Sequence, residues 1–389
     1  MGSRWSVGIS KVEAWRILLT ARTARIGWGR PPGLRGTPRP AKCRQADQGS
    51  ALLRFVKDCG RRNTRRFALA LIFALAAAAA TRPHYGGTLR VEVRESPASP
   101  EEFRAPKGFV LTTWEAGRRA IFTADDNAPG GRPFLDAVEI QMGRPLRDQS
   151  VDLELGKADI VELGPSELRK QSSGRRVWSS SPVRLMALVF GPRITDARLR
   201  EALALAVDRT AIHSVLLQRQ GEISGALLPQ WITGYAFVFS AAADIAKAQA
   251  LVAVLPPESR TLTLAADDPA NRSIADRIQL NARDAHLTVS VVPPSANADV
   301  RLVETRIAFA DSPHALASVA AALGLNEPPQ ARNPEEQYAA ERALLEGFRV
   351  IPLFHLPDVY GAGPRMQGGP VITPLGEWRF DSLWLEERP

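Results

Sequence analysis

Helices and strands alternate between residues 244 and 303, and this alternation constrains the fold more than any other feature of the chain. Helical periodicity over 244–254 and 271–285 alternates with apolar, β-branched runs at 261–264, 287–292 and 300–303. A helix that connects two strands is the pattern of a βαβ unit, in which the strands lie parallel and the helix covers the sheet. The sequence therefore predicts a mixed α/β fold with a largely parallel sheet in this region.

Further elements are predicted on either side of this region. Residues 183–190 form a nearly continuous apolar run, typical of a strand that is covered on both faces. Apolar residues at helical spacing predict one helix from 195 to 219, with charged side chains such as Arg209 on its solvated face. A helix over 333–348, which begins with an Asn-Pro-Glu-Glu start signal, leads into a strand at 350–354.

The positive charge of the chain is confined to its first residues. The whole chain has 50 Lys and Arg against 41 Asp and Glu, a formal charge of +9. Residues 1–66 hold 16 of these basic residues and only three acids, so the rest of the chain is mildly acidic. We therefore expect no nucleic-acid binding by the body of the protein. Cys43 and Cys59 also lie in this stretch, so the body has no disulfide, zinc knuckle or thiolate nucleophile.

The border between the basic stretch and the body resembles a secretory signal peptide. Four arginines within Arg61–Arg66 precede the apolar run Phe67–Ala80, which ends in three alanines. This order of charged, apolar and small residues predicts a signal peptide over 61–80 with cleavage near Ala80 and a soluble, exported, periplasmic product. The alternatives are a buried Ala/Leu helix and, for the export route, a twin-arginine signal. Residues 1–60 are predicted to be a disordered basic prefix, either a mistaken translation start or a genuine basic arm.

No catalytic, metal or cofactor motif is found in the sequence. The chain has no Gly-x-Ser-x-Gly, no phosphate-binding Walker loop and no His-Glu-x-x-His, and its five histidines are scattered singly. Asp267 and Asp268 follow a predicted strand, but no third metal ligand is evident, so a solvated turn is the preferred interpretation. We therefore expect a protein that is not an enzyme and binds no metal or cofactor.

Four stretches of the body resemble one family in their order along the chain. They are Gly86–Val91, Gly131–Asp136 with Leu155–Ile160, Ile194–Arg209, and Ile351–Phe354 with Leu375–Trp378. The third is the most specific, because it is similar to the string D-x-R-x-R-x-A-L-x-x-A-x-D-R almost position for position. The body is thereby similar to the extracellular solute-binding proteins of family 5, the peptide/nickel-type substrate-binding proteins of ABC transporters.

The resemblance implies a fold, a division into lobes and a function. It implies a two-lobed, periplasmic-binding-protein-like (type II) α/β fold with hinge crossings near 187–192 and 303–311. Lobe I comprises 81–192 and 304–389, and lobe II comprises 193–303. Family members have additional residues between the positions that correspond to Arg94 and Phe109, so lobe I of this chain is abbreviated.

The implied function is a monomeric solute-binding subunit of an ABC importer, which binds a peptide or similar small solute between the lobes and presents it to the permease. The alternative is a degenerate, non-transporting relative that serves as a partner-docking or sensory module.

The resemblance also implies candidate ligand residues. Phe309–Pro313 is similar to the family's W-x-x-D-Y-x-x-P, whose aspartate pairs with the terminal ammonium of a bound peptide. Asp311 is therefore the predicted ligand residue, and the alternative is that it only caps a helix. Trp114, Trp231 and Tyr235 are candidate aromatic walls, with core packing as the alternative for each.

Overall fold

The computed structural model describes residues 83–103, 105–169 and 176–386. The predicted prefix, signal peptide and cleavage position lie outside these residues. None of the helices in the described ranges has the length and hydropathy of a membrane span.

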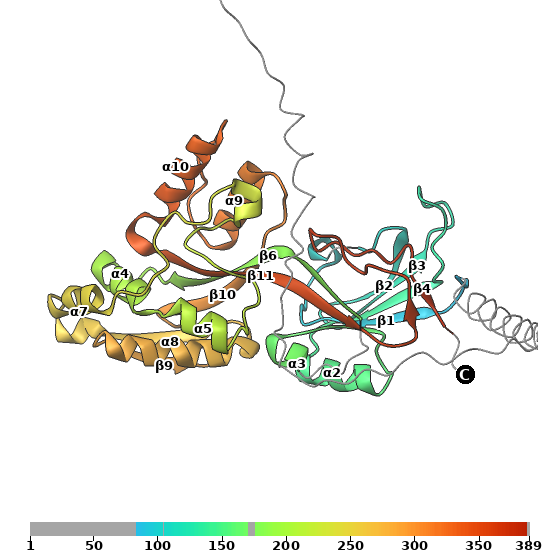
Figure 1. Ribbon diagram of the computed structural model, residues 1–389, viewed down its shortest axis with the longest axis horizontal. Coiled ribbons are helices and arrows are strands. Elements are labelled where there is room, and N and C mark those ends of the chain that lie inside the picture. Colours follow the sequence, from blue (N-terminus) through green and yellow to red (C-terminus); the bar gives the residue numbers. More distant parts are fainter. Residues whose placement is uncertain (1–82, 104, 170–175, 387–389) are drawn as a thin grey trace, which may run out of the picture. The chain divides into compact units, whose positions relative to one another are not determined.

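The described residues form one mixed sheet of 11 strands in the order β2-β3-β4-β1-β5-β11-β6-β10-β8-β9, with β7 beside β11 (Figure 1). The strands are β1 (Thr88–Glu92), β2 (Phe109–Glu115), β3 (Arg119–Ala124), β4 (Ala137–Gln141), β5 (Ile160–Glu162), β6 (Arg176–Phe190), β7 (Glu222–Ile223), β8 (Thr261–Ala266), β9 (Thr288–Val292), β10 (Val300–Arg306) and β11 (Val350–Ala362). Two short strands, β12 (Met366–Gln367) and β13 (Trp384–Leu385), pair separately.

Helices connect these strands along the chain. They are α2 (Leu146–Glu154), α3 (Pro165–Arg169), α4 (Ala197–Ala206), α5 (Arg209–Val215), α6 (Gln230–Thr233), α7 (Ile245–Ala253), α8 (Arg272–Asp284), α9 (Ser312–Ala322) and α10 (Pro334–Leu345), with short 3-10 turns at Pro100–Glu102, Pro257–Arg260, Pro269–Asn271 and Glu346–Phe348. The predicted βαβ region is confirmed, because β8, α8, β9 and β10 follow one another and β8 lies parallel to both β9 and β10.

Two long strands, β6 and β11, run antiparallel through the middle of the sheet, and we call this pair the ribbon. At one end β11 also pairs with β5, and at the other β6 also pairs with β10. The ribbon thus joins two halves (Figure 1). The first half comprises β1–β5, α2, α3 and residues 363–386, and the second half comprises β7–β10 and α4–α10.

The return crossing differs from the expectation that placed it near residues 303–311. The crossing is instead β11, because β10 pairs with the second-half end of β6 and α9 and α10 then pack on the same half of the sheet. The lobe boundaries expected at 192 and 303 stay a prediction.

Each half has apolar clusters of its own. In the first half, β1, β3 and β4 pack with the C-terminal segment in a cluster that includes Phe122 and Phe380. In the second half the pleat of β6 divides its side chains: Met186 and Leu188 face the cluster of α4, α5, α7 and α8, whereas Leu185 faces the cluster of α9 and α10. None of these clusters of described residues contains side chains from both halves, so apolar packing does not cross between them.

The single helix predicted over 195–219 is wrong. The chain leaves the helical conformation at Val207, and Asp208 starts a new helix by accepting a hydrogen bond from the Ala211 amide at 2.9 Å. The expected solvated position of Arg209 is wrong as well. Its side chain is buried because backbone carbonyls, including that of Pro352 on β11 at 3.2 Å, accept from the guanidinium.

Candidate functional site

The ribbon is interrupted at the point where the two halves meet. Pro182 of β6 lies directly opposite Pro357 of β11, and the register of the pair shifts on both sides of Pro357. Proline has no backbone N–H, so neither residue can donate a hydrogen bond across the ribbon at this position. The ribbon therefore lacks backbone hydrogen-bond donors at the boundary between the two apolar regions. A connection that is weakest between two separately packed regions has the geometry of a hinge.

Parallel strands of both halves end beside this boundary. β1 and β5 lie parallel in the first half, as do β8 and β10 in the second. Arg94, two residues beyond β1, forms an ion pair with Asp268, two residues beyond β8. The carboxyl ends of strands from both halves thus face one another, and in open α/β sheets this is where ligands bind.

Charged side chains gather at this boundary, and we call them the junction cluster. Its members come from the ends of strands in both halves and from the middle of the ribbon, and they are Arg94, Glu95, Glu162, Arg184, Asp268, Glu304, Arg306 and Asp358. Three guanidiniums face five carboxylates, so the cluster has an excess of negative charge when all are ionised. Such a site favours a ligand that brings a positive charge.

The ribbon's own members of the cluster form a buried pair. Arg184 donates from Nε to Asp358 at 2.5 Å, and its Nη2 donates to Glu95 at 2.6 Å. Arg306 reaches the other oxygen of Asp358 at 2.7 Å. Burial by itself raises the pKa of Asp358, but the two guanidiniums outweigh it and lower the pKa below its usual range. Asp358 is therefore an anion that holds both arginines in place.

Glu162 and Arg94 form the first-half side of the cluster. One oxygen of Glu162 accepts from the backbone N–H of Arg94 at 2.8 Å and from its Nε at 3.2 Å. Burial raises the pKa of Glu162, and the neighbouring Arg94 only partly offsets this.

Asp311 has the geometry of a helix cap. It precedes α9, and its carboxylate accepts from the His314 amide at 3.2 Å and also contacts the His314 ring. Its side chain is 56% exposed, and the hydrogen bond from the His314 side chain lowers its pKa. The segment that leads to it is fixed to the ribbon, because the Ile307 amide donates to the Val183 carbonyl at 2.8 Å. Asp311 is thus an exposed anion four residues beyond the point at which this segment is bonded to the ribbon.

The structure brings Trp231 to the same part of the ribbon. Its indole Nε1 donates to the Pro182 carbonyl at 2.8 Å, and its side chain stays partly exposed. Tyr235 lies in the second half, where its hydroxyl donates to the buried Glu341 at 2.5 Å. Trp114 is separate from both, because it packs beside Phe103 against the apolar cluster of the first half.

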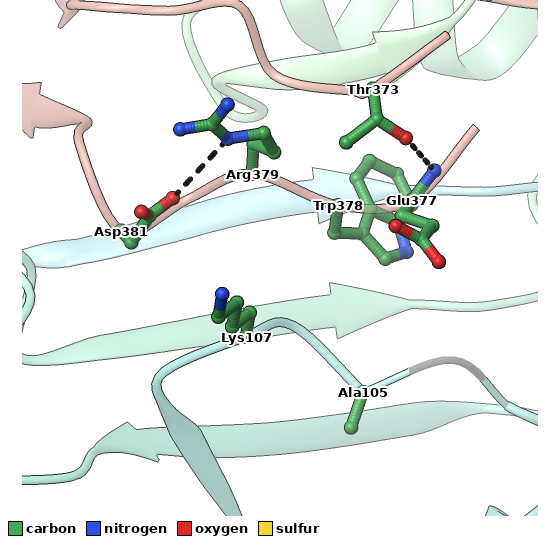
Figure 2. Close-up of a pocket in the computed structure, with 7 residues that line it drawn as sticks. All are labelled: Ala105, Lys107, Thr373, Glu377, Trp378, Arg379 and Asp381. Carbon is green, nitrogen blue, oxygen red and sulfur yellow. Dashed lines mark hydrogen bonds and ion pairs between the residues drawn. The ribbon is translucent and has the colours of Figure 1, made fainter. Parts of the chain in front are cut away.

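A cavity of about 710 Å³ lies in the first half next to the boundary (Figure 2). It is lined by Ala105, Lys107, Thr373, Glu377, Trp378, Arg379 and Asp381. The turn between Thr373 and Glu377 forms one wall, and Gly376 within this turn accepts from Arg306 of the junction cluster at 2.9 Å. The cavity and the junction cluster therefore share a wall.

The sequence analysis missed the junction cluster. Its signal was a charged residue inside an apolar strand, such as Arg184 after Val183 or Asp358 before Val359, but each partner lies on a distant segment. Asp268, expected in a solvated turn, pairs with Arg94. Among the residues that the structure describes, no group of three or more His, Cys, Asp or Glu side chains is arranged to hold a metal ion.

Two halves that are joined by a two-stranded, proline-interrupted ribbon and meet at a polar boundary define a binding protein of the two-lobed type. The profile described as "Bacterial extracellular solute-binding proteins, family 5 Middle" matches residues 71–315, which is more than half of the chain. The chain belongs to this family, and the predicted family resemblance is confirmed. No curated protein sequence matches the chain.

Solved structures show the same fold at low sequence identity. The chain is similar to the ABC transporter substrate-binding protein CtaP of Listeria monocytogenes (18% identity, TM-score 0.58, 72% of this chain and 66% of that one). It is also similar to the oligopeptide-binding protein AppA of Bacillus subtilis, solved with a nonapeptide (16%, 0.56, 72% and 66%). A third similar structure is NikA of Staphylococcus aureus, solved with Ni(L-His)2 (15%, 0.60, 72% and 68%). The predicted α/β, two-lobed fold class is confirmed, and the chain spans about two thirds of the length of these proteins.

Proposed function

We propose that the protein is the monomeric, exported solute-binding subunit of an ABC importer. It binds a peptide or a similar small solute between its two halves and presents the closed form to a membrane permease from the periplasmic side. The observation that carries this proposal is the ribbon that loses its hydrogen-bond donors at Pro182 and Pro357, where the two apolar regions end. A solute that contacts both halves shifts the equilibrium of such a hinge toward closure.

The chemistry of the boundary favours a solute with an amino group. The junction cluster has more carboxylates than guanidiniums, and Asp311 is an exposed carboxylate four residues beyond Ile307, whose amide is bonded to the ribbon. An ammonium group that leaves water for a closed site needs a paired carboxylate. We assign this role to Asp311 and the role of an aromatic wall to Trp231, whose ring is fixed by its bond to Pro182. Trp114 and Tyr235 remain candidates for more distant walls.

The test begins with mass spectrometry of small molecules that copurify with the full chain, followed by calorimetric titration of the identified solute or of short peptides. We expect Asp311→Asn to weaken the binding of an amine solute by roughly thirty- to several-thousand-fold, because one charge partner is lost. The melting temperature without solute stays nearly unchanged, since asparagine caps helices about as well as aspartate.

Asp244→Asn is the matched control, because Asp244 caps α7 in the same way and accepts from Lys247 at 2.9 Å. Equal affinities of Asp311→Asn and the original chain would remove Asp311 from the site. Failure of the chain to bind any peptide or copurifying solute would contradict the importer function and favour the partner-docking alternative.

A further inference from the structure

Arg94 is fixed to the first half by two bonds to one carboxylate. Both its backbone N–H, at 2.8 Å, and its side-chain Nε, at 3.2 Å, donate to Oε2 of Glu162 on β5. Glu162 is buried and is itself tied to α2, because its amide donates to Gln149 at 2.8 Å. These bonds leave the outer end of the guanidinium, Nη1 and Nη2, directed away from the first half.

Two carboxylates of the second half face this end of Arg94, and both are held in position by contacts within their own half. Nη1 donates to Asp268 Oδ2 at 2.7 Å, and Nη2 lies 3.8 Å from Glu304 Oε2. The remaining oxygen of each acid is held within the second half: Asp268 Oδ1 accepts from the Ala270 amide at 2.8 Å, and Glu304 Oε1 accepts from Asn271 Nδ2 at 2.7 Å. Both acceptors are thus oriented by their own half before Arg94 reaches them.

Few other contacts of the described residues hold the halves together away from the ribbon. No apolar cluster includes side chains from both halves, so their separation exposes little packed apolar surface. The other polar contacts between them include the pair of Arg306 with Glu95, at 3.9 Å, and the bond of Arg306 to the Gly376 carbonyl. When apolar burial does not decide an equilibrium, a few charge-assisted bonds can.

We propose that Arg94 is a latch: its bridge to Asp268 and Glu304 stabilises the joined arrangement of the two halves when no solute is bound. Loss of the guanidinium leaves Glu162, Asp268 and Glu304 without their common counterion, and their mutual repulsion then favours separation. The latch sets the fraction of solute-free protein in the joined state. For a solute that binds only the joined state, the apparent affinity is proportional to the fraction of protein in that state. The proposal concerns the solute-free protein and does not rest on the importer function.

A second arginine provides a matched comparison on the same segment. Arg90 precedes Arg94 by four residues, and it donates to both oxygens of Asp159, at 3.0 Å each, and to the Gly156 carbonyl at 2.8 Å. These partners all belong to the first half. Removal of Arg90 therefore costs a comparable ion pair without breaking a contact between the halves.

The experiment measures the distance between the halves by pulsed electron spin resonance on the full chain without solute. Spin labels are attached to cysteines at Val151 on α2 and Leu280 on α8, which are 45% and 47% exposed. Cys43 and Cys59 are replaced by serine so that only the two introduced cysteines react. The distance distribution then gives the ratio of joined to separated molecules, and circular dichroism monitors folding.

We expect Arg94→Ala to lower the ratio of joined to separated molecules about tenfold, as the loss of one bridging charge implies. Asp268→Asn should lower it in the same direction, and Arg94→Lys should recover part of it because the charge is kept. Arg90→Ala should leave the distances unchanged. An unchanged distribution in Arg94→Ala, or an equal shift in Arg90→Ala, would overturn the proposal. If Arg94→Ala does not fold, the distance distribution of Asp268→Asn tests the proposal by itself, because this substitution leaves the first half unchanged.

Discussion

The two halves use the same ribbon but cover their parts of the sheet differently. In the second half, helices that alternate with the strands along the chain pack on both faces. In the first half, two short helices lie against one face, and the C-terminal segment packs with the other through side chains such as Phe380 and Leu383 (Figure 1). The second half thus builds its core from β6, β11 and the consecutive segments between them, whereas the first half depends on residues 363–386 from the far end of the chain.

This difference predicts that the halves lose stability separately. Phe122→Ala removes a side chain that is 2% exposed in the first-half cluster, and Leu264→Ala removes one that is fully buried in the second-half cluster. We expect the free energy of local unfolding to fall by about 3 to 5 kcal/mol for Phe122→Ala and by about 2 to 5 kcal/mol for Leu264→Ala, the usual costs of such buried truncations. Amide hydrogen exchange measures this cost strand by strand.

We expect Phe122→Ala to accelerate exchange in β1, β3 and β4, with little change in β8 and β9, and Leu264→Ala to do the reverse. Val110→Ala serves as the control, because that side chain is 53% exposed and its truncation should have little effect. Equal acceleration in both halves by either core variant would show that the ribbon couples them into one cooperative unit.

The same difference explains what the sequence could predict. The βαβ region is local, and its periodicity alone placed β8, α8, β9 and β10 correctly. The lengths of β6 and β11 were underestimated, because proline and charged residues at the boundary interrupt their apolar pattern. The break at Val207 was also missed, since apolar residues keep helical spacing across it while Asp208 caps the next helix.

The site was predictable only in part. A family motif located Asp311, and Trp231, named from the sequence only as a candidate aromatic wall, lies beside the ribbon, where its indole donates to the Pro182 carbonyl. The junction cluster could not be derived, because its ion pairs join segments more than 50 positions apart, such as Arg94 with Glu162 and Arg184 with Asp358. Hydrophobic periodicity indicates which side chains of one segment are buried. It contains no information on which charged side chains of different segments form ion pairs.

Acidification offers a second way to separate the halves. His355 of the second half is buried, and its Nε2 lies 3.1 Å from the Leu227 carbonyl. Burial lowers the pKa of His355 from 6.5 to about 4, so the unfolded chain takes up this proton first as the pH falls. The second half should therefore lose about 2 kcal/mol between about pH 7 and pH 5. In the first half, burial raises the pKa values of Glu92 and Glu162, which works in the opposite direction.

Denaturant unfolding of the full chain at both pH values measures this effect, with exchange in β8 and β9 as the local readout. His355→Gln should unfold more readily at neutral pH but show the flatter pH dependence, because the titrating group is gone. His314→Gln is the control, since that side chain is 76% exposed. The buried Glu341 of the same half also has a raised pKa, so the difference between His355→Gln and the original chain is the decisive quantity. Parallel pH curves for the two proteins would contradict the assignment.

The smallest expected effect on stability concerns the prolines that divide the ribbon. The double variant Pro182→Val, Pro357→Val restores two N–H groups at the boundary, each able to add about 0.5 to 1.5 kcal/mol if bonded. The loss of two prolines makes the unfolded chain more flexible and offsets this by about 0.4 to 1 kcal/mol each, so at the middle of both ranges the free energy of unfolding rises by only about 0.6 kcal/mol. The hinge, in contrast, should stiffen: amide hydrogen exchange slows at residues beside the boundary, and the distance distribution between spin labels at Val151 and Leu280 narrows.

Pro352→Val is the matched control on β11, because Pro352 lies opposite Ala187 within the second half. Equal narrowing in Pro352→Val would mean that the boundary is no weaker than the rest of the ribbon, and the two halves would then move as one body.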